Sequence, residues 1–261
     1  MEHALYAEEL AKLDGLLQRL DPRVKIIGLL SLIIAVALAR NLSVILGLFA
    51  VAFALALLSK VPLRTLATRV WLGAFLFTGG IALPALFITT GRAIYHLPIL
   101  GWAITYQGLM SATYLITRVE TTATFSILLI LCTPWTHVLK SLRVLGVPVV
   151  FVVILGMTYR YIFLFLQTAY DMFESRQSRT VGRLSGTESR RIAAASTGIL
   201  LSKSFQLSSE VYLAMQSRGF RGEVYMLDEF KMQMRDWLWL VIFLAIASVA
   251  FYLGRQSMPF A

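Results

Sequence analysis

Long apolar runs constrain this chain more than any other feature. A helix needs roughly 17 to 25 apolar residues to cross a bilayer, because each residue rises about 1.5 Å through a hydrocarbon core about 30 Å thick. Five segments meet that requirement, namely residues 24–40, 42–58, 70–90, 108–131 and 237–253. With 58% hydrophobic and 15% charged residues, the chain is also too apolar for an ordinary soluble domain. The sequence therefore predicts an all-α, polytopic membrane protein with about five transmembrane helices.

Basic residues indicate which side of the membrane each connection faces, because cytoplasmic loops carry an excess of Lys and Arg. Nineteen basic residues lie before the first span or in residues 60–69, 133–146 and 171–236. The opposite side receives only Arg40, Arg92 and Arg255. We therefore expect these nineteen to face the cytoplasm, and residues 91–107 and 254–261 to face outward. This pattern predicts a multi-pass protein of the cell inner (cytoplasmic) membrane.

A sixth apolar run, residues 147–166, admits two interpretations. Hydropathy alone predicts a sixth span, but a full crossing would place the basic stretch 171–236 outside the cell. We therefore interpret the run as a helix that lies along or dips into the cytoplasmic interface. The predicted organisation is a membrane domain of four spans (1–131), a helical cytoplasmic or interfacial insertion (132–236), and a final span with the C-terminus (237–261).

The remaining bulk features exclude several classes of protein. The net charge of +10 comes from basic residues placed between apolar runs, which favours the anionic membrane surface over nucleic acid as a partner. Cys132 is the only cysteine, so we expect neither a disulfide framework nor a thiolate metal cage. The first 20 residues contain four acidic residues and no apolar core, so we do not expect them to form a cleavable signal peptide.

Several short motifs predict where helices begin and end. Asp21 followed by Pro22 is typical of a helix start, with Asp21 as N-cap and Pro22 at the first helical position. Thr133-Pro134 ends the fourth span, and residues 142–148 contain Gly146 as a helix C-cap with Pro148 beyond it. Further along, Leu207, Val211 and Met215 recur at steps of four, which predicts one apolar stripe on a long helix.

Two tripeptides in this insertion are candidates for contact with a partner, namely Ser178-Arg179-Thr180 and Ser217-Arg218-Gly219. Each is expected near the end of a long helix. An arginine there can simply complement the helix dipole, and Gly219 can simply end the helix. The alternative is that each arginine, flanked by small residues, projects into a groove of a partner protein. The occurrence of two such helix ends in one domain favours the second interpretation.

No enzymatic constellation competes with this reading. His3, His96 and His137 lie in different segments without companions at metal-ligand spacing, so we expect no metal site and no catalysis by this chain. Residues 198–204 faintly resemble a phosphate loop but lack its glycine before the lysine. We therefore expect no cofactor, and any ATP hydrolysis to occur on another subunit.

Two other classes of function were weighed. A self-contained carrier or channel could use the ionisable residues at membrane depth, Arg118, Glu120 and Arg160. Such a carrier does not require the large basic insertion at 132–236. A membrane-embedded enzyme using His96 or His137 lacks convergent acid, base and ligand residues.

The order of these motifs resembles the transmembrane T component of energy-coupling factor (ECF) ABC transporters, of the CbiQ type found with cobalt and nickel uptake systems. The pieces that carry the resemblance are residues 20–25 (LDPRVK), 133–134 (TP), 142–148 (LRVLGVP), 158–161 (TYRY), 176–182 (RQSRTVG) and 211–220 (VYLAMQSRGF). The resemblance covers nearly the whole chain. It also implies a cytoplasmic coupling domain before the final span, which agrees with the distribution of basic residues.

The resemblance further implies partners and a mechanism. Members of that family present two arginine-centred motifs to two cytoplasmic ABC ATPase subunits, and they hold a CbiM-like substrate-binding S component in the membrane, with a small accessory membrane subunit in some systems. By resemblance, the two arginines are Arg179 and Arg218. The family pattern commonly has alanine before each arginine and glycine after it, whereas this chain has Ser178, Ser217 and Thr180. The implied cargo is cobalt or nickel.

Overall fold

The computed structural model describes residues 15–88, 93–96, 103–179, 182, 185–220 and 232–256. The chain forms two compact units. We call Glu2–Val138 together with Phe230–Ala261 the bundle unit, and Leu139–Glu229 the paired-helix unit. The short helix α7 (Trp135–Val144) runs across the boundary between them. The expectation about a signal peptide falls mainly on residues outside the described ranges.

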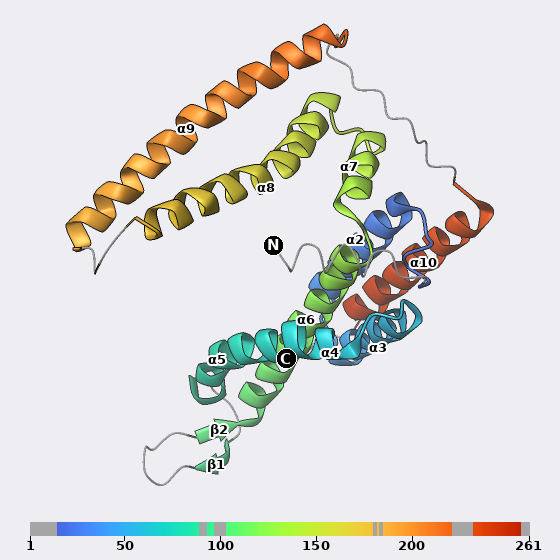
Figure 1. Ribbon diagram of the computed structural model, residues 1–261. Helices are drawn as coiled ribbons and strands as arrows, with labels where there is room; N and C mark the ends of the chain where they lie inside the picture. Colours follow the sequence, from blue (N-terminus) through green and yellow to red (C-terminus); the bar gives the residue numbers. More distant parts are fainter. Residues whose placement is uncertain are drawn as a thin grey trace. The chain divides into compact units, whose positions relative to one another are not determined.

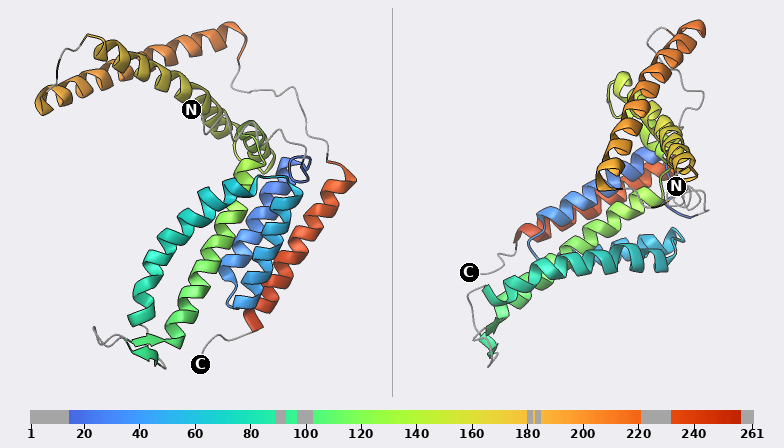
Figure 2. Two further views of the ribbon diagram at one scale, coloured as in Figure 1. Left: turned by 60° about the horizontal axis from the view of Figure 1, so that its bottom comes forward. Right: turned by 60° about the vertical axis from the view of Figure 1, so that its left-hand side comes forward.

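The bundle unit is built from long apolar helices that lie side by side (Figure 2). They are α2 (Pro22–Leu38), α3 (Leu42–Leu58), α5 (Leu72–Ile88), α6 (Tyr106–Leu131) and α10 (Met234–Gln256). The four-residue helix α4 (Leu63–Leu66) and a π-helical turn, η1 (Ala67–Trp71), lead into α5. Helix α2 packs against α10 and α6, while α3 and α5 pack against α6. Each of the five predicted spans is a helix.

The helices of the bundle unit bury one stripe and expose an apolar outer face. Ile45, Leu48 and Ala52 of α3 recur at steps of three and four and are buried. On the outside, Leu46 is 50% exposed and Phe77 of α5 is 73% exposed. Large apolar side chains on the outer face of a bundle fit a hydrocarbon surrounding, because lipid does not penalise their exposure as water does. The all-α membrane fold class is confirmed.

Among the described residues, three helices are long and apolar enough to cross a bilayer, and these are Tyr106–Leu131, Val149–Gln177 and Met234–Arg255. Leu42–Leu58 and Leu72–Pro84 are shorter apolar helices. Outside the helices, β1 (Ala93–His96) pairs antiparallel with β2 (Ala103–Thr105) between α5 and α6. The sequence interpretation did not foresee these strands, although the β-branched and aromatic residues in AIYH and AIT favour extended backbone.

The paired-helix unit contains α8 (Val149–Gln177) and α9 (Gly186–Ser217), which run antiparallel (Figure 1). The apolar run expected to form a helix over 147–166 is part of α8, which continues for 29 residues to Gln177. Helix α9 begins with a capping box in which the Ser185 hydroxyl accepts from the backbone N–H of Glu188 at 3.2 Å, and the Glu188 carboxylate accepts from the Ser185 backbone N–H at 3.1 Å. The orientation of α8 relative to the bilayer stays a prediction.

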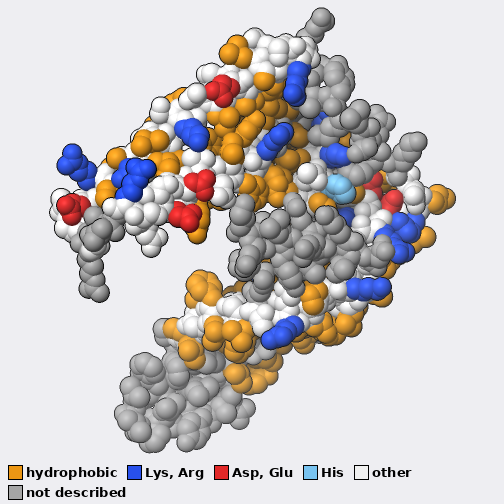
Figure 3. Space-filling view, in the orientation of Figure 1, with side chains coloured by type: hydrophobic (Ala, Val, Ile, Leu, Met, Phe, Trp, Pro, Cys, Tyr) orange, Lys and Arg blue, Asp and Glu red, His pale blue; other side chains and the backbone are white. Residues whose placement is uncertain are grey.

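Apolar side chains line the space between α8 and α9. The predicted stripe of Leu207, Val211 and Met215 faces a cavity of about 650 Å³ whose other wall includes Met157 and Phe165 of α8. Figure 3 shows hydrophobic side chains gathered between the two helices, with charged side chains around them. The spacing of the stripe therefore predicted correctly which face of α9 meets α8.

Candidate coupling site

Arg218 occupies the capping position at the C-terminal end of α9. The N–H of Phe220 donates to the carbonyl of Met215 at 3.0 Å, and the N–H of Gly219 donates to that of Gln216 at 2.9 Å. These two bonds form a Schellman motif, which requires a left-handed residue after the cap, and Gly219 has a φ of +79°. The motif ends the helix directly at Arg218, whose side chain is exposed.

Arg179 follows the C-terminal end of α8. Ser178 is the C-cap residue, and its hydroxyl donates to the carbonyl of Glu174 at 3.0 Å. The N–H of Arg179 donates to the carbonyl of Arg176 at 3.0 Å, so the backbone still turns as in a helix. The Arg179 side chain is exposed. Thr180, the third residue of this tripeptide, lies outside the described residues.

The two arginines lie at opposite ends of the α8–α9 pair, because the helices are antiparallel and each arginine follows a C-terminus (Figure 1). Helix α9 has 32 residues, which corresponds to a length of about 48 Å at 1.5 Å per residue. The structure therefore does not bring Arg179 and Arg218 together into one site. It separates them by a distance on the scale of a small protein domain.

Other cations surround each arginine. Arg218 lines a cavity of about 560 Å³ together with Arg143 of α7 and Arg160 of α8, and none of the described residues that line it is acidic. Arg179 lines a cavity of about 380 Å³ with Arg176, Lys203 and the carboxylate of Asp171. In the described lining of both cavities, cationic side chains outnumber acidic ones, which favours an acidic partner surface.

The LDPRVK motif ties the bundle unit together where α2 and α10 begin and α6 ends. Asp21 caps α2 by accepting from the N–H of Arg23 at 2.9 Å, as predicted. Lys25 is 1% exposed, and its ammonium donates to the carbonyl of Cys132, the C-cap of α6, at 3.0 Å. The buried carboxylate of Asp236 accepts from the N–H groups of Asp21 at 3.2 Å and Gln233 at 3.0 Å.

The bonds made by Lys25 and Asp236 form what we call the bundle anchor. Sequence reasoning missed this anchor and assigned the motif a capping role alone. The signal was a lysine three residues after a proline at the start of an apolar helix. A cation placed there must find a partner inside the protein, because a buried unpaired charge is very costly. The bundle unit continues from Cys132 to Val138 and resumes at Phe230. The anchor therefore lies within a few residues, along the chain, of both ends of the paired-helix unit.

Arg118 has a structural partner at the far end of α2. Its guanidinium donates to the carbonyl of Ala39, the C-cap of α2, at 2.7 Å and lies 4.6 Å from the centre of the Tyr114 ring. The Tyr114 hydroxyl donates to the same carbonyl. A guanidinium at a helix C-terminus is favoured by the helix dipole. Arg118 therefore joins α6 to α2.

The three ionisable residues considered for a carrier pathway do not lie in one unit. Arg118 and Glu120 belong to α6 of the bundle unit, whereas Arg160 belongs to the paired-helix unit and lines the cavity beside Arg218. Among the described residues, neither carboxylate oxygen of Glu120 has a hydrogen-bond partner. The structure thus gives Arg118 a structural role that a carrier pathway does not require.

No metal site emerges from the part of the chain that the structure describes, since it contains no group of three His, Cys, Asp or Glu residues able to hold an ion. His137 lies on α7 and His96 in β1, while His3 is outside the described ranges. The expectation that this chain binds no metal by itself stays a prediction.

Comparison with known proteins identifies the family. Residues 15–227 match the family model CbiQ, described as cobalt transport protein. The chain belongs to the CbiQ family. That match includes LDPRVK, Cys132 and both arginine tripeptides, whereas Asp236 lies beyond it.

Relatives of the CbiQ-family chain agree with this assignment. An uncharacterised protein of Methanocaldococcus jannaschii is 32% identical over 259 residues, covering 96% of this chain and 87% of that protein. The energy-coupling factor transporter transmembrane protein of Lacticaseibacillus paracasei is 29% identical over 224 residues, covering 80% and 82%. That of Limosilactobacillus fermentum is 25% identical over 263 residues, covering 93% and 94%.

The predicted resemblance to an ECF transmembrane component of the CbiQ type is confirmed. The chain is a multi-pass protein of the cell membrane and a subunit of a transporter.

Proposed function

We propose that this chain is the coupling subunit of an ECF importer for cobalt or nickel. It transmits the ATP-driven motion of two cytoplasmic ABC ATPase subunits to a CbiM-like substrate-binding S component in the membrane. ATP hydrolysis and metal binding belong to those partners. The family description and the names of the relatives support this assignment.

The observation that carries the proposal is the placement of Arg179 and Arg218. Each is exposed at the C-terminal end of a long helix, and the two ends point in opposite directions along one helix pair. Two ATPase subunits need two separate contact points, and the length of α9 provides that separation. The neighbouring cations make each end suited to an acidic groove.

The mechanism follows from the stiffness of the two helices. When the ATPase subunits close on ATP, the grooves that hold the two arginines change their mutual distance or angle. A helix transmits such a displacement along its axis with little bending, so α8 and α9 move as levers. The S component then reorients and releases the ion to the cytoplasm.

The test compares Arg179→Ala, Arg218→Ala and the double variant, each co-expressed with the ATPase and S subunits. Arginines buried in ATPase grooves act as interface anchors, so each truncation is expected to cost about 2 kcal/mol or more of binding free energy. Arginines that only complement a helix dipole contribute about 0.3 to 1 kcal/mol to helix stability. Co-purification of the ATPases and uptake of radioactive cobalt and nickel provide the readout.

Two further variants sharpen the comparison. Arg191→Ala removes an exposed arginine of α9 that neither tripeptide contains, and it is expected to retain ATPase binding and uptake. Arg218→Lys keeps the charge but lacks the planar guanidinium, so it is expected to restore little function. If the double alanine variant transports like the parent, the assignment of these arginines to ATPase docking is wrong.

A further inference from the structure

A cavity of about 390 Å³ lies at the end of the bundle unit where α3 ends and α2 and α10 begin. Three cationic side chains line it, contributed by three separate parts of the chain: Arg19, Lys60 and Arg235. Among the described residues that line it, none carries a carboxylate. The nearby carboxylates of Asp21 and Asp236 accept hydrogen bonds from backbone N–H groups. The charged side chains of the described lining are therefore all cationic.

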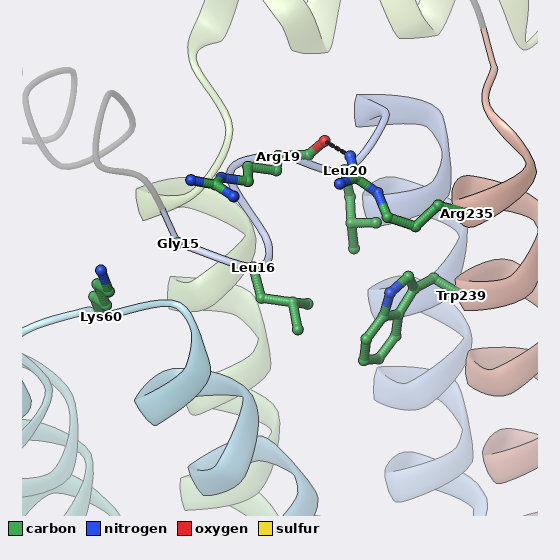
Figure 4. Close-up of a pocket in the computed structure, with 7 residues that line it drawn as sticks. All are labelled: Gly15, Leu16, Arg19, Leu20, Lys60, Arg235 and Trp239. Carbon is green, nitrogen blue, oxygen red and sulfur yellow. Dashed lines mark hydrogen bonds between the residues drawn. The ribbon is translucent and has the colours of Figure 1, made fainter.

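The same cavity has an apolar side. Leu16 and Trp239 line it, and Figure 4 shows their side chains below the guanidinium groups of Arg19 and Arg235. Trp239 lies near the start of α10, a helix long and apolar enough to cross a bilayer. Tryptophan at the end of a span is typical of the headgroup region of a membrane, where one side of the ring is apolar and the other is wet.

Bonds inside the bundle unit fix the walls of this cavity. Arg235 donates to the backbone carbonyl of Arg19 at 2.9 Å, which holds its guanidinium beside the 15–20 segment while further N–H donors remain on the group. That segment is itself fastened to the end of α3. The N–H of Leu16 donates to the carbonyl of Leu58 at 3.2 Å, and the Gln18 amide donates to that of Ser59 at 3.0 Å.

Lys60 has an unusual backbone. It follows the C-cap Ser59 of α3 in a Schellman motif, where Val61 donates to the carbonyl of Ala56 at 3.3 Å and Lys60 donates to that of Leu57 at 3.1 Å. This position needs left-handed backbone and is usually glycine. Lys60 has a φ of +53°, and it is the one non-glycine with positive φ among the described residues. A lysine kept in a strained conformation indicates a function for its side chain.

We propose that this cavity binds the phosphate headgroup of an anionic phospholipid. Lys60 and Arg235 contact the phosphate beside Arg19, while Leu16 and Trp239 contact the glycerol and the first part of an acyl chain. The combination of three cations above an apolar floor at the end of membrane helices fits an amphiphile with a negative head. Inorganic phosphate would use the cations but leave the apolar floor without a partner. Binding here would stabilise the junction at which the 15–20 segment, α3 and α10 meet.

The test measures lipid retention on the delipidated full-length chain in detergent by native mass spectrometry. The probes are dioleoyl phosphatidylglycerol and dioleoyl phosphatidylcholine at equal concentration. We expect the parent to retain phosphatidylglycerol at least about thirtyfold more strongly. Lys60→Gly is expected to lower that preference about fivefold and Lys60→Gly/Arg235→Gln about thirtyfold, because each basic residue strengthens anionic-lipid binding about fivefold.

Lys60→Gly also separates binding from folding, because glycine relieves the left-handed backbone and is expected to keep or raise the melting temperature. Arg40→Gln/Arg64→Gln is the matched control, since it removes two exposed cations that do not line the cavity. The proposal is overturned if Lys60→Gly retains the full lipid preference, or if the control loses as much as Lys60→Gly/Arg235→Gln. It is also overturned if millimolar inorganic phosphate displaces phosphatidylglycerol, which would make the cavity a site for free phosphate.

Discussion

At the scale of single residues, the buried side chains of Lys25 and Asp236 connect helix ends of the bundle unit. Lys25 is almost completely buried and bonds the last carbonyl of α6, while Asp236 bonds the first residues of α2 and α10. A charged donor of this kind contributes more than a neutral one, because its hydrogen bond is strengthened by the low surrounding dielectric.

Replacement of Lys25 by Met tests this anchor. Met fills a similar volume but leaves the Cys132 carbonyl without its donor, and the loss of a buried partner costs about 1 to 3 kcal/mol. We expect a lower melting temperature for the purified chain in detergent, measured by thermal-shift fluorescence. Lys203→Met, at an exposed position of α9, is expected to melt with the parent. An unchanged melting temperature for Lys25→Met would show that the bond does not stabilise the bundle.

At the scale of elements, helix ends decide where the side chains proposed for coupling lie. The end of α9 depends on Gly219, whose positive φ lets the chain close the Schellman motif directly after Arg218. A different terminal conformation would extend or fray α9 and move the guanidinium away from its position. Gly219 therefore ends the helix, as the capping interpretation predicted. The same backbone turn leaves the Arg218 side chain exposed at the helix end.

Gly219→Ala tests this end against Gly198→Ala in the middle of the same helix. Alanine at a left-handed position costs about 1 to 2 kcal/mol. We therefore expect the backbone amides at positions 219 and 220 to lose protection from hydrogen exchange. The amide at position 220 is expected to exchange about five to thirty times faster. At Gly198, a Cβ would meet open space in a regular helix. There alanine is expected to slow exchange up to about fivefold. Hydrogen exchange measured by mass spectrometry gives the exchange rates in both variants. Equal effects of the two substitutions would contradict the role of Gly219 in ending α9.

At the scale of the whole molecule, two features bear on the side of the membrane on which the paired-helix unit lies. Helix α8 is long and apolar enough to cross, and Val152 is its one buried residue. The distribution of basic residues nevertheless favours a cytoplasmic position for everything from residue 171 to residue 236.

Single cysteines decide between these topologies. Ser185→Cys is expected to react with an impermeant thiol reagent only after the cells are permeabilised, whereas Arg40→Cys is expected to react in intact cells. The native Cys132 provides the background measurement, because it is fully buried and burial raises the pKa of its thiol to about 11. Labelling of Ser185→Cys from outside would mean that α8 crosses the bilayer.

The sequence by itself determined the features that depend on neighbouring residues. Apolar runs longer than a bilayer is thick predicted the helices, and the stripe of Leu207, Val211 and Met215 predicted the face of α9 that meets α8. Asp21, Gly146 and Gly219 predicted helix ends, and the structure has an N-cap at the first and left-handed backbone at the other two. These outcomes follow from hydrophobic periodicity and from backbone geometry, which act over a few residues.

Only the tertiary structure decided the contacts between distant segments. The bond from Lys25 to Cys132 spans 107 residues, and that from Asp21 to Asp236 spans 215. Likewise, the cavity lined by Arg19, Lys60 and Arg235 exists because three helix ends meet. Local periodicity carries no information about which helix ends become neighbours. That choice depends on how whole helices pack, so buried polar partners and composite sites appear only once the bundle is assembled.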